Sequence, residues 1–152
     1  MKKIITKSER ETENLGKKIA RKILKKGPKK TAMVLALKGD LGGGKTTFLK
    51  GFAQGLGIKE KILSPTFIIL RKFQIPNSKF QRFYHFDCYR IEKPKEILNL
   101  GFKEIVENSK NIVAIEWAER VKRILPKNVL HINFKFLGKK EREILIKWEK
   151  DC

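Results

Sequence analysis

The sequence predicts an α/β fold with a mainly parallel central sheet, antiparallel additions and helices on both faces. Two short apolar runs, at residues 33–37 and 111–115, are typical of strands buried on both faces of a parallel sheet. Segments with helical spacing of apolar residues alternate with strand-like segments through the first two thirds of the chain. This alternation indicates helices layered on a sheet.

The first half of the chain contains two predicted helices and the first buried strand. Residues 12–27 carry one apolar helical face and end at the breaker pair Gly27-Pro28. The strand at 33–37 leads into a glycine-rich loop, residues 39–44. A second helix is predicted for residues 45–56, and its buried face would be formed by Phe48, Leu49, Phe52 and Ala53.

The second half adds predicted hairpins and one further helix. Residues 67–73 and 82–87 are predicted to pair around the turn sequence IPNSK. A helix is expected at 96–108, before the second buried strand. Period-two alternation then predicts a terminal hairpin formed by residues 129–136 and 142–148.

Composition indicates one folded domain. Hydrophobic residues make up 41% of the chain, and no linker or repeat divides it, so residues 1–152 are expected to form a single domain. No apolar run approaches the roughly 20 residues that span a bilayer. The two cysteines, Cys88 and Cys152, do not have metal-ligand spacing. We therefore expect a cytoplasmic protein without membrane contact.

The charge is strongly positive. The chain has 36 Lys and Arg against 16 Asp and Glu, a formal net charge of +20. Such a balance favours a polyanionic partner, and a contact with tRNA through the basic surface is one expectation. A lysine-rich surface without a specific partner explains the same composition.

Residues 39–46, GDLGGGKT, match the pattern G-x-x-x-x-G-K-[ST] between a predicted strand and a predicted helix. Glycine N–H groups and the positive end of the helix can surround phosphates, Lys45 can reach the β and γ phosphates, and the Thr46 hydroxyl can bind Mg²⁺. The motif predicts a P-loop NTPase fold with a nucleotide and Mg²⁺ as cofactors, and the absence of guanine-reading motifs favours ATP as that nucleotide. Thr47 also fits an ordinary helix residue. The candidate nucleotide contacts are Gly39, Leu41, Gly42, Gly43, Gly44, Lys45, Thr46 and Thr47.

Acidic side chains are predicted to complete the site. Glu116 follows a buried strand, at the sheet edge where ligands bind, and can bind Mg²⁺. Asp87 ends another strand on the same face as His85, and it can hold a magnesium-bound water or orient the attacking water. Thr66 can sense the γ phosphate as switch threonines do. The candidate catalytic residues are Lys45, Thr66, Asp87 and Glu116, and the candidate metal ligands are Thr46 and Glu116.

The motifs GDLGGGKTT, SPTF, YHFDCYR and EWAE, in this order and spacing, resemble the TsaE (YjeE) family. These are small bacterial P-loop ATPases required to make threonylcarbamoyladenosine in tRNA. The segment ETENLG resembles the opening helix of that family, so the resemblance covers roughly Glu11 to Glu119. The chain departs from the family pattern at Gly43, Cys88 and Ala118, and none of these departures removes a charged or ligand group.

The resemblance implies a role for each candidate residue. Lys45 and Thr46 would bind phosphate and Mg²⁺, and Glu116 would be the second protein contact to the metal. Asp87 would be needed for hydrolysis, Thr66 would be the switch residue, and Trp117 would lie near the nucleotide. The implied partners are the threonylcarbamoyl transferase and its paralogue subunit, of the TsaD and TsaB type. Weak hydrolysis by the isolated chain is expected, because the ATPase cycle would support turnover of that complex.

Other functions share the P-loop. A small-molecule kinase usually carries an arginine-rich lid, for which Arg120 and Arg123 are the only nearby pair. A regulatory nucleotide-binding switch of the GTPase type would need an N/T-K-x-D motif and a D-x-x-G motif, and the sequence contains neither. A nucleic-acid-binding module with a vestigial P-loop is disfavoured, because the lysine, the hydroxyl and both acids are intact.

Overall fold

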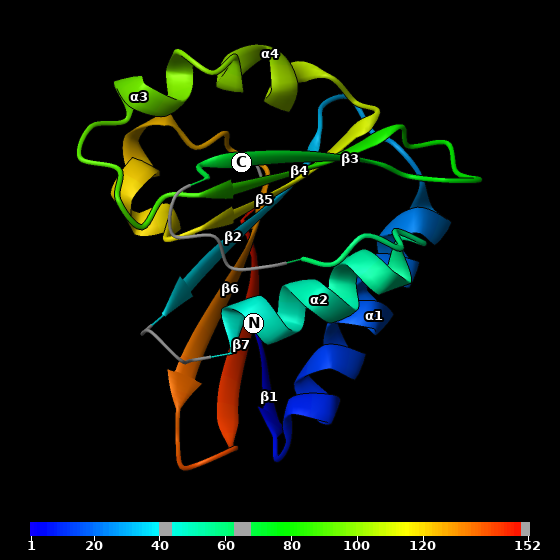
Figure 1. Ribbon diagram of the computed structural model, residues 1–152, viewed down its shortest axis with the longest axis vertical. Helices are drawn as coiled ribbons and strands as arrows, with labels where there is room; N and C mark the ends of the chain where they lie inside the picture. Colours follow the sequence, from blue (N-terminus) through cyan, green and yellow to red (C-terminus); the bar gives the residue numbers. More distant parts are fainter. Residues whose placement is uncertain (40–43, 63–67, 150–152) are drawn as a thin grey trace.

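The computed structural model describes residues 1–39, 44–62 and 68–149. Within these ranges one sheet has seven strands in the order β1-β7-β6-β2-β5-β4-β3 (Figure 1). The strands are β1 (Lys2–Thr6), β2 (Met33–Gly39), β3 (Leu70–Gln74), β4 (Arg82–Asp87), β5 (Asn111–Glu116), β6 (Val129–Phe136) and β7 (Arg142–Glu149).

The centre of the sheet is parallel and its edges are antiparallel, as the sequence predicts. Strand β2 pairs in parallel with β5 and β6, and β5 pairs in parallel with β4. Both predicted hairpins, β3–β4 and β6–β7, are confirmed. The sequence analysis missed β1, which pairs antiparallel with β7. Its short stretch KKIIT has a weak strand pattern, so its pairing depends on a neighbour that lies at the other end of the chain.

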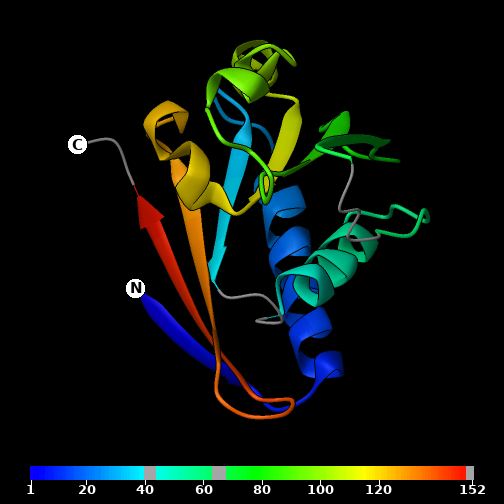
Figure 2. The same cartoon turned by 60° about the vertical axis from the view of Figure 1, so that its left-hand side comes forward.

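Helices cover both faces of the sheet (Figure 2). The helices α1 (Glu9–Lys26) and α2 (Lys45–Gly55) pack on one face, whereas α3 (Lys95–Leu98), α4 (Phe102–Glu107) and the 3-10 helix η1 (Ala118–Ile124) pack on the other. Alternate residues of β2 belong to different cores. Leu35 and Leu37 pack with α1 and α2, while Val34 and Ala36 pack with the opposite layer. This two-sided burial explains why the strand is apolar throughout.

Two predicted helix boundaries are wrong. The first helix begins at Glu9 rather than at residue 12, because the Ser8 hydroxyl caps it by accepting a hydrogen bond from the Glu11 N–H at 3.1 Å. The predicted helix at 96–108 is two short helices, α3 and α4. The chain breaks at Gly101, whose φ of 86° does not belong to a right-handed helix. None of the helices in the described ranges could cross a membrane.

The close crossing of α1 and α2 depends on glycines. A Cβ atom on Gly16 would overlap the carbonyl oxygen of Phe48, and a Cβ atom on Gly51 would overlap the carbonyl oxygen of Glu13. We expect Gly51→Ala to lower the free energy of unfolding by about 1–3 kcal/mol, because the two helices must move apart. Denaturant unfolding checks this, with Gly138→Ala as the control, since a Cβ atom there meets nothing within 4 Å. Equal stability of the two variants would contradict the tight crossing.

Candidate functional site

The carboxyl ends of β2, β4 and β5 bring the predicted site residues together. Asp87 ends β4 and Glu116 ends β5, and the two residues are direct partners in the parallel register. The next residue after β5, Trp117, lies beside Lys45, the first residue of α2. Ligands bind at this edge in open α/β sheets. The structure thus assembles Lys45, Asp87, Glu116 and Trp117 from separate parts of the chain.

The two described ends of the glycine loop are Gly39, the last residue of β2, and Gly44, which precedes α2. A Cβ atom on Gly39 would overlap the carbonyl oxygen of Phe134, so only glycine fits at the start of the loop. Helix α2 begins at Lys45, and Thr46 and Thr47 are half-buried in its first turn. The predicted residues Leu41, Gly42, Gly43 and Thr66 lie outside the described residues.

The Lys45 ammonium group is buried in the site, with only 5% of the residue exposed. Its Nζ donates a hydrogen bond to the carbonyl oxygen of Gly39 at 2.5 Å and lies 3.7 Å from the centre of the Trp117 ring. Both contacts stabilise a positive charge that has lost most of its water. These two contacts hold the Lys45 ammonium between Gly39 and Trp117, where it could bind a phosphate group.

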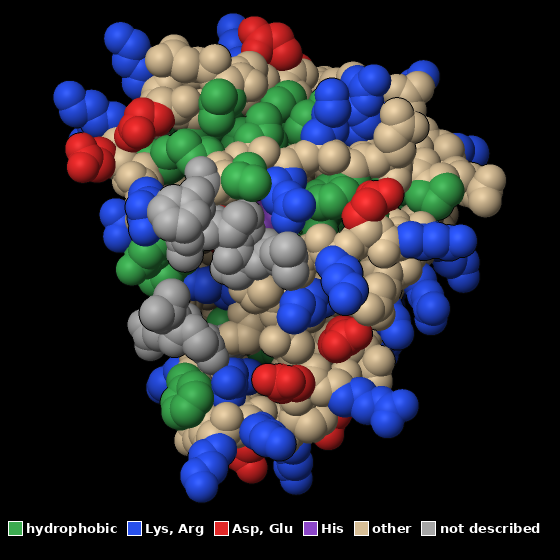
Figure 3. Space-filling model, viewed as in Figure 1, with side chains coloured by type: hydrophobic (Ala, Val, Ile, Leu, Met, Phe, Trp, Pro, Cys, Tyr) green, Lys and Arg blue, Asp and Glu red, His purple; other side chains and the backbone are tan. Residues whose placement is uncertain are grey.

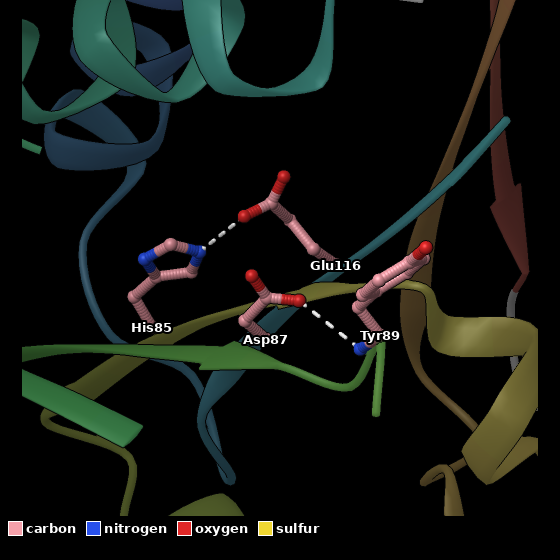
Figure 4. Close-up of polar contacts among 4 residues, drawn as sticks. All are labelled: His85, Asp87, Tyr89 and Glu116. Carbon is pink, nitrogen blue, oxygen red and sulfur yellow. Dashed lines mark hydrogen bonds and ion pairs between the residues drawn. The ribbon is translucent and has the colours of Figure 1, made fainter. Parts of the chain in front are cut away.

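A buried hydrogen bond holds one oxygen of Glu116. His85 Nε2 lies 2.7 Å from Glu116 Oε2, and the two side chains are 1% and 4% exposed. The second oxygen of Glu116 points away from His85 (Figure 4). The sequence placed His85 beside Asp87 on one strand face, and it could not show that the imidazole contacts the acid of the neighbouring strand. Such a partner orients a metal-binding carboxylate.

Asp87 is half-buried next to a second acid. Burial, and then the nearby charge of Glu116, raise the pKa of Asp87 above its ordinary value of 3.8, although the backbone N–H of Tyr89 donates to its Oδ1 at 3.1 Å. A divalent cation would relieve the repulsion between these two carboxylates. The paired acids Asp87 and Glu116 therefore fit Mg²⁺, which commonly uses one or two carboxylates together with substrate phosphates. Thr46, in the first turn of α2, could add a hydroxyl ligand.

The described ranges contain no group of three or more His, Cys, Asp and Glu side chains that could hold a metal ion without other ligands. Glu116 and Thr46 remain the candidate protein ligands, and Asp87 stands close enough to Glu116 to act on a metal-bound water.

Aromatic side chains form one wall of the site. Trp117 has a φ of 57°, which is unusual for a residue other than glycine and turns the chain sharply out of β5. Its ring centre lies 5.1 Å from that of Tyr89, and the guanidinium carbon of Arg120 lies 5.8 Å from each ring centre. No role was predicted for Tyr89, which lies exposed in the turn after β4, because its contact with Trp117 joins two distant segments.

Comparison with known proteins agrees with this geometry. Residues 6–144 match the family model described as "Threonylcarbamoyl adenosine biosynthesis protein TsaE". The chain belongs to the TsaE family. The resemblance seen in the sequence motifs is thus confirmed, and the match extends beyond them at both ends. Membership implies a nucleotide-binding P-loop protein.

Individual TsaE relatives cover most of the chain. A tRNA threonylcarbamoyladenosine biosynthesis protein TsaE from Rickettsia typhi is 37% identical over 143 residues, which are 93% of this chain and 92% of the relative. The protein of the same name from Bacillus subtilis is 44% identical over 111 residues, which are 73% of this chain and 66% of the relative. The crystal structure of YdiB from Bacillus subtilis superposes with a TM-score of 0.77 at 33% identity, and the match covers 98% of this chain and 86% of that one. The predicted α/β P-loop fold is confirmed by this likeness.

The contact between His85 and Glu116 leads to a prediction for magnesium. We expect His85→Ala to lower the affinity for Mg²⁺ in the presence of nucleotide by about tenfold. Side chains that hold a metal ligand in place contribute about 10–100-fold to metal affinity. Trp117 fluorescence during Mg²⁺ titration at fixed ATP, in a Trp148→Phe background that leaves Trp117 as the one tryptophan, measures this effect. His85→Gln, which keeps a donor, is expected to recover part of the affinity. His131→Ala, on β6, is the control, and an unchanged titration in His85→Ala would exclude the orienting role.

Proposed function

We propose that this TsaE-family chain is a magnesium-dependent ATPase that acts in threonylcarbamoyladenosine modification of tRNA. The observation that carries the proposal is the meeting of Lys45, Asp87 and Glu116 at one sheet edge beside the start of α2. Relatives in the family carry the name of that biosynthesis. Residues 1–152 would act as one ATPase domain.

The proposed roles follow the chemistry of each side chain. Lys45 and the loop N–H groups bind the β and γ phosphates, with the remaining loop contacts made by Gly39, Leu41, Gly42, Gly43, Gly44 and Thr47. Thr46 and Glu116 hold Mg²⁺, which when bound neutralises phosphate charge. Asp87 accepts a hydrogen bond from the attacking water and orients it. Thr66 is proposed as the switch residue, and Trp117 packs against the nucleotide.

The proposed work of the ATPase lies in a complex. The isolated chain would hydrolyse ATP weakly and would support repeated turnovers of a threonylcarbamoyl transferase and its paralogue subunit, of the TsaD and TsaB type. Reconstitution with that transferase complex, tRNA, threonine, bicarbonate and ATP, with and without this chain, tests the proposal. Modification is expected to stop after about one cycle without the chain. Continued cycling in its absence would refute the proposal, and phosphorylation of a small molecule by the chain alone would favour the kinase alternative.

Direct contact with tRNA is a further part of the proposal. Lys and Arg side chains are spread over the whole face seen in Figure 3, where Asp and Glu are fewer. We expect tRNA affinity to fall by about tenfold or more between roughly 50 and 200 mM salt, because bound lysines release counterions from the phosphates. Filter binding across this salt range measures it, and a flat response would indicate that the composition alone accounts for the charge. A function in tRNA modification also implies a cytoplasmic location.

A further inference from the structure

A groove with a volume of about 890 Å³ lies between α1 and the edge strands β1 and β7. It opens at the end of the sheet opposite the nucleotide site. Its lining includes Met33, the first residue of β2, whereas the glycine loop begins at Gly39, the last residue of the same strand. Seven residues of strand separate the two places by about 20 Å. The groove is therefore not part of the phosphate site.

The groove has the form of a wedge. Beyond the residues that line the groove, the hydroxyls of Thr6 and Thr12 form a buried hydrogen bond of 2.6 Å, which ties the end of β1 to the first turns of α1. From this point β1 and α1 diverge (Figure 2). Burial along β7 follows the divergence, since Ile144 is fully buried while Ile146 and Trp148, on the same strand face, are only half-buried.

The floor of the wedge is apolar. Helix α1 contributes Leu15 and Ile19, and the edge strands contribute Ile4, Ile146 and Trp148. All five side chains are half-buried rather than enclosed. These large apolar side chains form a concave strip that is open to solvent, and burying them would be favourable. An apolar occupant would bury them.

The rim of the wedge is cationic. Lys18, Lys22 and Lys26 follow one side of α1, Lys29 and Lys30 follow its end, and Lys2 faces them from β1, whereas no acidic residue lines the groove among the described residues. The Nζ atom of Lys29 lies 5.3 Å from the centre of a Trp148 ring, so one rim charge reaches over the floor.

We propose that this groove docks an acidic amphipathic helix of a partner protein. An apolar stripe with helical spacing would fill the floor, and carboxylates on its two sides would meet the lysine rim. A second copy of this chain, at a net charge of +20, would bring lysines against lysines. A nucleic acid backbone matches the rim but leaves the apolar floor unfilled, and a flat bilayer surface does not enter a wedge. The proposal does not depend on ATP hydrolysis.

Trp148 supplies a local probe of occupancy. The chain has two tryptophans, so Trp117→Phe leaves Trp148 as the only emitter. The probe is a synthetic helix of about 18 residues with a leucine stripe and glutamates on its flanks. We expect it to shift Trp148 emission to shorter wavelength at saturation. A peptide of the same composition without the stripe is expected to bind at least about tenfold more weakly.

Matched variants distinguish binding in the groove from non-specific attraction by the net charge of the protein. The triple variant Lys22→Glu, Lys26→Glu and Lys30→Glu is expected to bind the striped peptide about tenfold or more weakly than the wild type does. The same change of charge at Lys59, Lys61 and Lys103, which do not line the groove, is expected to change affinity less than about twofold. Ile19→Ser tests the floor with a similar expected loss. If Ile19→Ser fails to fold by circular dichroism, the two surface triple variants decide the question.

The remaining outcomes each overturn the proposal. Equal binding of the two peptides, or equal losses in the two triple variants, would mean that net charge alone attracts acidic peptides. A Trp148 shift caused by tRNA and abolished only in the rim variant would assign the groove to nucleic acid. A Trp148 shift caused by anionic lipid vesicles would assign the groove to a membrane. A Trp148 shift that grows with protein concentration, together with self-association in sedimentation, would assign the groove to a second copy of the chain.

Discussion

Lys45→Ala is expected to lower ATP hydrolysis at least about 100-fold, the size of effect that follows loss of one group that stabilises charge in a transition state. The ammonium is buried, donates to the Gly39 carbonyl oxygen and lies over the Trp117 ring, so the substitution removes a positive charge that the fold holds in place at the site. Thr46→Ala is expected to have a comparable effect, because it removes the proposed hydroxyl ligand of Mg²⁺. Phosphate release under saturating ATP and Mg²⁺, with the partner complex present, measures both.

The control for these variants is Lys50→Ala, which removes an exposed lysine from the same helix. It is expected to keep the hydrolysis rate within about twofold, since surface changes remote from the site have small effects. Full turnover in both Lys45→Ala and Thr46→Ala would show that the glycine loop does not bind the reacting phosphates, and the proposed function would fall with it.

Asp87→Asn is expected to abolish hydrolysis and, at the same time, to stabilise the protein without nucleotide. The loss of activity follows from the loss of the carboxylate that orients the attacking water, an effect of about 100-fold or more. The gain in stability follows from the half-buried position of Asp87 opposite Glu116. An uncharged amide of the same shape avoids both the desolvation and the repulsion between the two carboxylates.

The size of the stability effect depends on pH. Because burial and Glu116 raise the pKa of Asp87 in the folded state above 3.8, the folded protein binds that proton more tightly than the unfolded chain does. The contribution of the protonated group is fully present below the unfolded pKa and is lost as pH rises through the higher folded-state pKa. Asp87→Asn should therefore melt like the wild type below that window and at a higher temperature above it.

Thermal melts without Mg²⁺ on both sides of this window measure the effect. Glu119→Gln removes an exposed acid from η1 and serves as the control for the loss of one negative charge. If Asp87→Asn melts at or below the wild-type temperature at neutral pH, the proposed repulsion between the Asp87 and Glu116 carboxylates is wrong. Added Mg²⁺ and nucleotide should raise the melting temperature of both proteins, because the proposed ligands Lys45, Thr46 and Glu116 are present in both.

Much of the nucleotide site was predictable because its signals are local. The loop at 39–46 matches a pattern whose glycines, lysine and hydroxyl each have a physical task, and the structure places Lys45 at the start of a helix as that pattern requires. Glu116 and Asp87 were identified because each follows a run of strand residues, and strand ends in a parallel sheet share one edge.

The parts that sequence reasoning missed are contacts between distant residues. His85 contacts Glu116, which lies 31 positions away, and a pattern in one strand does not state which neighbour it will have or in what register. Trp117 and Tyr89 meet because of the left-handed turn after β5. The break at Gly101 was missed because the apolar spacing on its two sides continued one helical pattern.

The sequence by itself determined most of the element types, the P-loop, the two acidic strand ends and the likeness to the TsaE family. These follow from periodicity and short motifs, which report on residues a few positions apart. Only the tertiary structure decided that Asp87 stands opposite Glu116, that His85 holds that acid, and that β1 leaves an apolar wedge against α1. Register and edge pairing arise from the packing of side chains on both faces of the sheet, and that packing energy is shared among segments from the whole chain.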